Sequence, residues 1–190
     1  MVEALLIPFL KRSGWAGTLQ PKNMRGSGHF LSKIARAVER SLQPEEKVDY
    51  VFGLLDLHGV GLSYPREVTS RDQKAEYLKK HLRELVSFSY RGRFHPHVAV
   101  HELEAWVLAD DGALRDYLKQ PMQPWPTPEA VNFDSPPVRH LKDLFMRHKR
   151  VAYGKAVHGK RLFEMIDPRI VMNKCHHFKL FVDDLMMVSS

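Results

Sequence analysis

The stretch 93–110 changes its hydrophobic period near its middle, and this change constrains the fold more than any other feature. Phe94, Val98 and Val100 alternate with more polar positions, which is typical of a strand. From Glu102 onward the apolar residues recur at helical spacing. We therefore expect a strand that runs directly into a helix. In an open α/β sheet, such a junction at the carboxyl end of a strand is where ligands and metals collect.

A second strand is expected at 48–57, where nearly continuous apolar sequence ends in an acid, as in a strand buried in a parallel sheet. Helical patterns at 29–42 and 70–87 alternate with the two strands. This order predicts a small parallel sheet flanked by helices and joined by right-handed crossovers. Pro96 has no backbone N–H to donate, so we expect the strand at 94–100 to be paired only after it.

The sequence after residue 110 is helical in character and has no further strand pattern. We therefore expect an α/β core at 1–110 and a C-terminal helical extension at 111–190 that packs on it. The remaining helices are expected at 3–12, 111–119, 137–148, 159–166 and 175–187.

The composition is that of a globular protein, with 44% hydrophobic and 27% charged residues. No apolar run approaches the length of a bilayer span, and 2–10 lacks the flanks of a signal peptide. The single cysteine, Cys175, excludes an internal disulfide. We therefore expect a cytoplasmic protein without a membrane partner. The net charge of +7 favours a polyanionic partner, with nucleic acid first, although a merely basic domain has the same charge.

Carboxylates follow both predicted strands. Asp56 ends the first strand, and Glu102 and Glu104 follow the second. Mg²⁺ and Mn²⁺ prefer such oxygen ligands, so we expect Asp56 to share a cation with Glu102 or Glu104. The alternative for Asp56 is that it caps the turn after the strand. Of the two glutamates, we expect one to bind metal and the other to pair with a basic group or accept backbone hydrogen bonds near the helix start. Supporting roles are expected from three neighbouring residues, His58, Gly59 and His101.

Histidines and the cysteine offer two weaker metal sites. His95 and His97 share one face of the predicted strand, where they could bind a metal or form a polar face under a helix. Cys175 precedes two histidines, but the chain has no partner pair at zinc-finger spacing. Core packing by Cys175 is the favoured alternative, and at most one of His176 and His177 can then be buried.

Basic residues are dense in the predicted helical extension. This density suits contacts with nucleic-acid phosphates, although a solvated helical face is a common reason for such a run. The residues expected to bind nucleic acid are Arg139, Lys142, Lys155 and Lys160.

Several motifs follow one another along nearly the whole chain. They are Leu55-Asp-Leu-His-Gly59, 94–105 with His101-Glu-Leu-Glu-Ala105, Pro128-Glu-Ala-Val-Asn132, Ser135-Pro-Pro-Val-Arg139, Tyr153-Gly-Lys155 and Cys175-His-His-Phe178. Jointly, these motifs make the chain resemble domain-of-unknown-function family 4276, bacterial proteins regarded as diverged Toprim domains. The resemblance implies a Toprim-like, Rossmann-like α/β core and magnesium-dependent phosphodiester chemistry. It also implies an ABC-type ATPase partner and a role in phage defence.

The resemblance assigns Asp56 to the metal-binding Asp motif of Toprim domains, with His58 where that motif has a second Asp. Glu102 and Glu104 belong to a His-Glu-x-Glu signature. Family members open with a strand that carries the presumed acid–base glutamate, whereas this chain opens inside the following helix, so Glu3 does not inherit that role. We therefore expect weak or no activity from a nuclease of this kind. The alternatives are a degenerate adaptor that binds an ATPase or nucleic acid, and a zinc-binding module.

Overall fold

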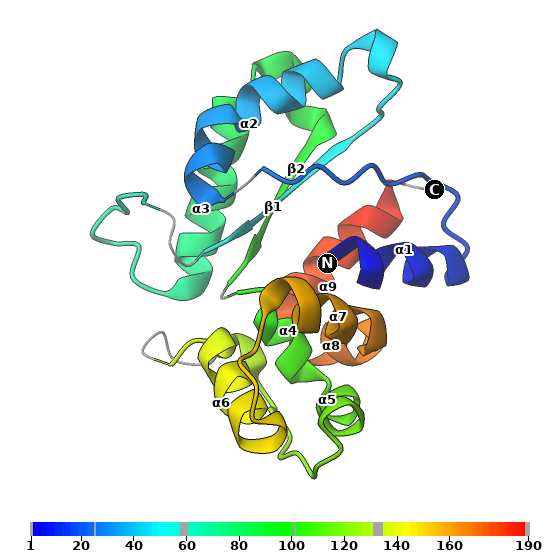
Figure 1. Cartoon of the computed structure of the whole chain (residues 1–190). Helices are drawn as coiled ribbons and strands as arrows, with labels where there is room; N and C mark the ends of the chain where they lie inside the picture. Colours follow the sequence, from blue (N-terminus) through cyan, green and yellow to red (C-terminus); the bar gives the residue numbers. More distant parts are fainter. Residues whose placement is uncertain (1, 25, 58–60, 101, 131–134, 189–190) are drawn as a thin grey trace. The chain divides into compact units, whose positions relative to one another are not determined.

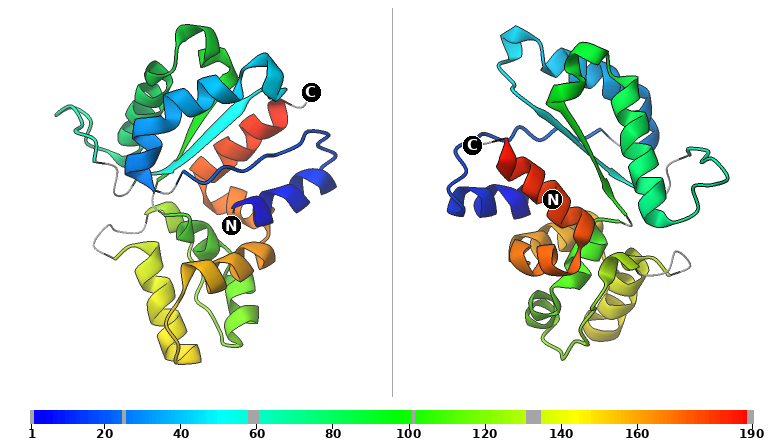
Figure 2. Two further views of the ribbon diagram at one scale, coloured as in Figure 1. Left: turned by 45° about the horizontal axis from the view of Figure 1, so that its top comes forward. Right: turned by 180° about the vertical axis from the view of Figure 1, so that it is seen from behind.

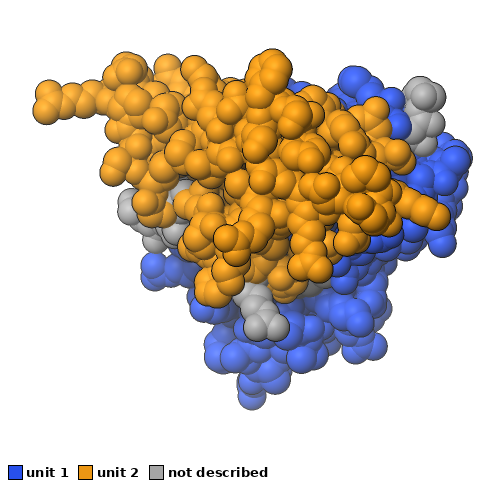
Figure 3. All heavy atoms as spheres, turned by 90° about the horizontal axis from the view of Figure 1, so that it is seen from above, with its two compact units in different colours: residues 1–21, 101–190 blue, residues 22–100 orange. Residues whose placement is uncertain are grey.

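The computed structural model describes residues 2–24, 26–57, 61–100, 102–130 and 135–188 (Figure 1). Its contacts divide the chain into two compact units, which Figure 3 colours separately. Unit 1 comprises residues 1–21 and 101–190, and unit 2 comprises residues 22–100. This division differs from the predicted one at residue 110, because the N-terminal helix groups with the C-terminal half of the chain.

Unit 2 contains a two-stranded parallel sheet, which confirms the small parallel sheet predicted from the sequence. Strand β1 (Val51–Asp56) pairs with strand β2 (Phe94–Ala99) in a register that sets Asp56 opposite Ala99. The prediction that pairing begins only after Pro96 is wrong, because Pro96 lies inside β2 opposite Gly53. Among the described residues β2 has a single neighbouring strand, and a proline is tolerated where its nitrogen faces away from the ladder.

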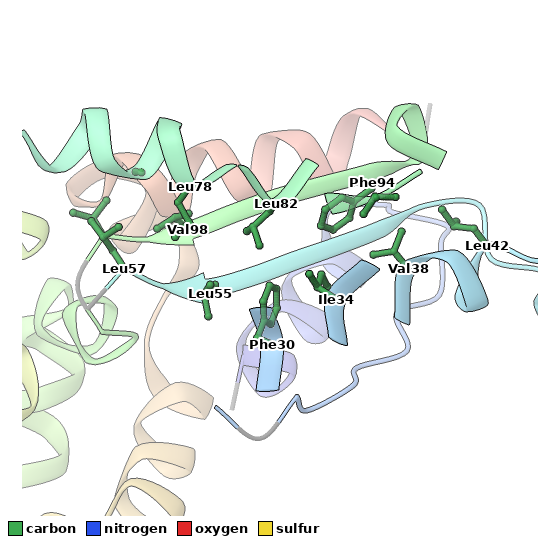
Figure 4. Close-up of a cluster of buried hydrophobic side chains, with 13 residues drawn as sticks. Phe30, Ile34, Val38, Leu42, Leu55, Leu57, Leu78, Leu82, Phe94 and Val98 are labelled. Atoms are coloured by element: carbon green, nitrogen blue, oxygen red, sulfur yellow. The ribbon is translucent and has the colours of Figure 1, made fainter. Parts of the chain in front are cut away.

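Helices α2 (Ser27–Ser41) and α3 (Arg71–Leu85) lie next to each other and to the sheet, as two views in Figure 2 show. Their apolar residues form one core with the sheet face that carries Leu55 and Val98. Figure 4 shows this core, with Phe30 of α2 and Leu82 of α3 directed toward the strands. Since side chains alternate along a strand, Asp56 belongs to the opposite face.

The N-terminus of α3 is fixed by a capping box, which explains why this helix is clear in the sequence. The Ser70 hydroxyl accepts a hydrogen bond from the backbone N–H of Gln73 at 3.1 Å. In return, the Gln73 side chain accepts from the backbone N–H of Ser70 at 3.0 Å. Two amides that the first turn would otherwise leave unpaired are satisfied in this way.

The regular secondary structure in the described residues of unit 1 is entirely helical. Its core includes Trp106, whose ring centroid lies 4.6 Å from that of Phe178, and Trp15 donates from Nε1 to the carbonyl of Leu185 at 3.1 Å. None of the helices in the described parts of the chain has the length and apolar character needed to span a bilayer. The helices of unit 1 are α1 (Val2–Arg12), α4 (Glu104–Ala109), α5 (Asp111–Leu118), α6 (Pro137–Lys149), α7 (Lys160–Met165), α8 (Pro168–Lys174) and α9 (His176–Met187).

Candidate functional site

Asp56 is the last residue of β1 and lies at the carboxyl edge of the sheet, as the sequence predicts. The ladder continues one residue further, because the N–H of Leu57 donates to the carbonyl of Ala99 at 2.8 Å. The Asp56 side chain is half-buried. The supporting residues His58 and Gly59 lie outside the described residues. Asp56 belongs to unit 2, whereas Glu102 and Glu104 belong to unit 1.

The two histidines of β2 lie on the same sheet face as Asp56 and pack against an aromatic ring. The ring of Phe52 stacks on His95 with centroids 4.8 Å apart and on His97 with centroids 6.2 Å apart. His97 is buried, with 6% of its surface exposed. Within the described ranges, no group of three or more His, Cys, Asp or Glu side chains is arranged to hold a metal ion.

Glu102 receives a backbone hydrogen bond from a distant helix. Its Oε2 atom accepts from the N–H of Val138, 3.0 Å away, in the first turn of α6. The amides of a first helical turn have no partner within the helix, and the helix dipole favours a negative charge there. Glu102 thus stabilises the start of α6. His101, the residue before it, lies outside the described residues.

Glu104 begins α4 and has no exposed surface. The ammonium group of Lys155 lies 3.0 Å from its Oε2 atom, and the hydroxyl of Tyr153 donates to Oε1 at 3.5 Å. Burial raises the pKa of the Glu104 carboxyl, and the charge of Lys155 partly offsets this increase. Burial and the adjacent Glu104 raise the pKa of the Tyr153 hydroxyl. Glu104 is therefore the centre of a buried polar cluster with Tyr153 and Lys155.

A π-helical turn, η4 (Lys155–Gly159), follows Tyr153 and carries Lys155 at its first position. The carbonyl of Gly154 accepts from the N–H groups of Val157, His158 and Gly159 at 3.2, 2.8 and 3.3 Å. Sequence reasoning missed this turn because a π turn has no characteristic hydrophobic period. Such turns are frequent at functional sites. The motif Tyr153-Gly-Lys155 therefore supplies both partners of Glu104, which belongs to a different motif.

A second pair of motifs meets at the start of α9. The Oε2 atom of Glu129, in the short turn η3 (Pro128–Ala130), accepts from the N–H of His177 at 3.1 Å. Burial raises the pKa of Glu129, while the amides of His177 and Phe178 act in the opposite direction. Glu129 therefore satisfies the first turn of a helix that has no side-chain cap of its own.

Cys175 packs in the core of unit 1, which is the alternative to zinc that the sequence favoured. Its side chain has no exposed surface, and burial raises the pKa of its thiol. His177 is buried and His176 is exposed, as helical geometry requires.

The four residues predicted to bind nucleic acid differ in their surroundings. Arg139 and Lys142 are exposed on α6, and Lys160 is exposed at the start of α7. The side chain of Lys155 is 46% exposed, but its ammonium group neutralises the buried Glu104. Lys155 therefore has a structural role that the density of basic residues did not reveal.

Comparison with known proteins identifies the family of the chain. No curated protein and no solved structure matches it. A family model does match, and it extends over residues 1–186, nearly the whole chain. The match includes both pairs of motifs that the structure joins, Glu104 with Lys155 and Glu129 with His177. The chain therefore belongs to the family described as a domain of unknown function, DUF4276.

Proposed function

We propose that this chain is a Mg²⁺- or Mn²⁺-dependent phosphodiesterase of Toprim-like type that acts on DNA or RNA in the cytoplasm. The observation that carries the proposal is the position of Asp56 at the carboxyl edge of a parallel sheet, in register with the last residue of β2. Ligands of open α/β sheets bind at this edge. A carboxylate oxygen is also the ligand that Mg²⁺ and Mn²⁺ prefer.

Of the two glutamates, Glu102 is better suited to bind a metal ion than Glu104. Glu102 is partly exposed and follows Ala99, the last residue of β2, by three residues in the sequence. Glu104 is buried and already neutralised by Lys155. The proposal therefore rests metal binding on Asp56, keeps Glu102 as the second ligand expected from the sequence, and gives Glu104 the structural role. A bound Mg²⁺ would polarise the scissile phosphate and lower the pKa of an attacking water.

Basic side chains would hold the phosphate backbone of the substrate. Arg139, Lys142 and Lys160 are exposed, and the whole chain carries a net charge of +7. Each neutralised phosphate releases counterions, so binding should weaken as the salt concentration rises. Replacing Lys142 with Gln should reduce that salt dependence.

The decisive experiment combines cleavage and metal binding. Plasmid DNA and single-stranded RNA are incubated with Mg²⁺ or Mn²⁺ and the wild-type chain, Asp56→Asn, or Asp49→Asn as a control. Asp49 is exposed just before β1, so its replacement removes the same charge away from the sheet edge. Mn²⁺ affinity is measured in parallel by electron paramagnetic resonance. We expect Asp56→Asn alone to lose Mn²⁺ affinity, together with whatever cleavage the wild-type chain shows. Equal cleavage by Asp56→Asn and the wild type would exclude the metal assignment.

A second candidate function is a catalytically degenerate Toprim-like adaptor that binds an ABC-type ATPase or nucleic acid, with a role in phage defence. It is favoured by the contacts that both glutamates of the His-Glu-x-Glu signature already make within the protein. Glu102 accepts a hydrogen bond from the Val138 amide, and Glu104 forms an ion pair with Lys155. The adaptor predicts nucleic-acid binding or stable association with an ATPase, without any dependence on divalent metal. Binding that is unchanged by EDTA, together with absent cleavage, would favour the adaptor over the enzyme.

A further inference from the structure

Unit 1 has a surface pocket that involves none of the residues of the metal proposal. Its volume is about 360 Å³. The pocket lies among α5, α6 and α7, which are labelled in Figure 1. Pockets for small ligands range from about 300 to 1,000 Å³. This pocket is at the small end of that range, which suits one nucleotide better than a dinucleotide.

The lining of the pocket combines aromatic rings with cations. Tyr117 contributes a partly exposed ring, and the buried ring of Phe145 packs behind it with the two centroids 5.6 Å apart. The Lys149 ammonium lies 5.9 Å from the Tyr117 ring centroid, and Arg161 adds a guanidinium group. Asp116 is the acidic residue of the lining, and its Oδ1 atom pairs with Nε of Arg115 at 3.5 Å. Neither Lys149 nor Arg161 forms an ion pair with any of the described residues, so both cations can meet an anionic ligand.

His158 adds an oriented hydrogen-bond donor to this lining. Its Nδ1 atom accepts from the N–H of Gly154 at 2.8 Å, so the proton of the neutral ring is on Nε2. The π turn η4 sets this position, and the His158 ring packs on Phe145 with centroids 4.8 Å apart. His158, which lines the pocket, can therefore offer an Nε2–H donor to a ligand in addition to the two cations.

We propose that this pocket binds a nucleotide, with the base against the aromatic and aliphatic lining and the phosphate between Lys149 and Arg161. Val151 and Met165 complete the apolar part, and both side chains are more than two-fifths exposed, at 45% and 44%. Such exposed apolar surface beside cations is suited to a ligand that is both aromatic and anionic. The same chemistry is offered by a free mononucleotide and by the 5′-phosphorylated end of a single strand.

The test measures binding of AMP, adenosine and inorganic phosphate to the full chain by isothermal titration calorimetry. We expect AMP to bind about tenfold more tightly than adenosine or phosphate, since each lacks one half of the recognised chemistry. A 5′-phosphorylated single-stranded oligonucleotide that competes with AMP identifies a strand end as the source. Absence of competition identifies a free nucleotide. No binding of AMP at millimolar concentration, or equal binding of phosphate alone, would overturn the proposal.

Matched variants locate the site. Lys149→Gln and Arg161→Gln should each weaken AMP binding about tenfold. Arg147→Gln removes a charge from the same helix outside the pocket and should leave binding unchanged. All three side chains are exposed, so the fold should survive each change. Asp56→Asn should leave AMP binding intact, so this inference and the metal proposal can fail separately. An equal loss from Arg147→Gln would show general charge attraction and refute the pocket.

Discussion

The Glu104 carboxylate, which has no exposed surface, lies 3.0 Å from the ammonium group of Lys155. The two residues come from different motifs, and the Lys155 side chain is 46% exposed. The pair therefore buries the negative charge while leaving the positive one partly in water. Removing the lysine should cost more than removing a comparable surface charge, because it leaves a buried carboxylate without its counter-ion.

Lys155→Met should lower the free energy of unfolding by about 1–3 kcal/mol. This range is below the full value for a buried pair because solvent already screens the exposed ammonium group. Lys160→Met is the matched control, since Lys160 is exposed five residues further along the chain. It should leave stability unchanged. Urea unfolding followed by circular dichroism measures both, and equal effects of the two changes would contradict the proposed role of Lys155.

The pH dependence of stability should report the titration of Glu104. Burial raises its folded-state pKa above the ordinary value of 4.5, so the folded chain binds a proton more tightly than the unfolded chain. The stability that this proton contributes is full below the unfolded-state pKa and is lost as the pH rises through the folded-state pKa. Glu104→Gln removes this dependence, so its stability relative to the wild type should increase as the pH rises.

Urea unfolding at several pH values between about 4 and 8 tests this expectation. Glu164→Gln, which replaces an exposed carboxylate on α7 with an amide, is the control for the change of side chain itself. A Glu104→Gln variant that instead becomes less stable relative to the wild type as the pH rises would show that the ion pair, and not burial, dominates the pKa.

Glu129→Ala should destabilise the chain by about 1–2 kcal/mol, because the N–H of His177 in the first turn of α9 loses its acceptor. Glu129→Gln keeps an acceptor oxygen and should cost less. Thermal unfolding of both variants measures the difference. Equal loss from the two would mean that the charge, and not the hydrogen bond, is what α9 requires.

Local patterns account for the elements that the sequence predicted well. The alternation at Phe94–Ala99 and the continuous apolar run before Asp56 led to the two strands, and parallel pairing followed from the helix between them. The capping box at Ser70 likewise marks the start of α3. Helix α8 was missed although Asp167 and Pro168 are helix-start signals, because a helix of 7 residues shows too little periodicity.

The polar clusters were not predictable from such patterns. Glu104 and Tyr153 are 49 residues apart, and Glu129 and His177 are 48 apart, so no local period connects them. An acid in the first turn of a helix ordinarily indicates a solvated residue that interacts with the helix dipole. Tertiary packing instead buries Glu104, and this turns an apparent surface acid into part of the core. The position of Asp56 depends on its own strand, which is why it was predictable.

Among the described glycines of unit 2, Gly53 is the one that has other atoms close to its missing side chain, and it yields a prediction about the core that supports the sheet edge. A Cβ atom added at Gly53 would lie 3.1 Å from a ring carbon of Phe94 and 3.2 Å from one of Phe30. Both rings are buried in the core between α2 and the sheet, so neither can move away freely. Gly53→Ala should therefore lower the free energy of unfolding by about 1–3 kcal/mol through overpacking.

Gly28→Ala is the control, because an added Cβ meets nothing within 4 Å in the first turn of α2. Alanine should leave stability unchanged there or raise it slightly, since it favours the helix. Urea unfolding of both variants measures the two effects, and a Gly53→Ala chain as stable as the wild type would show that the core beneath β1 and β2 is looser than these distances imply.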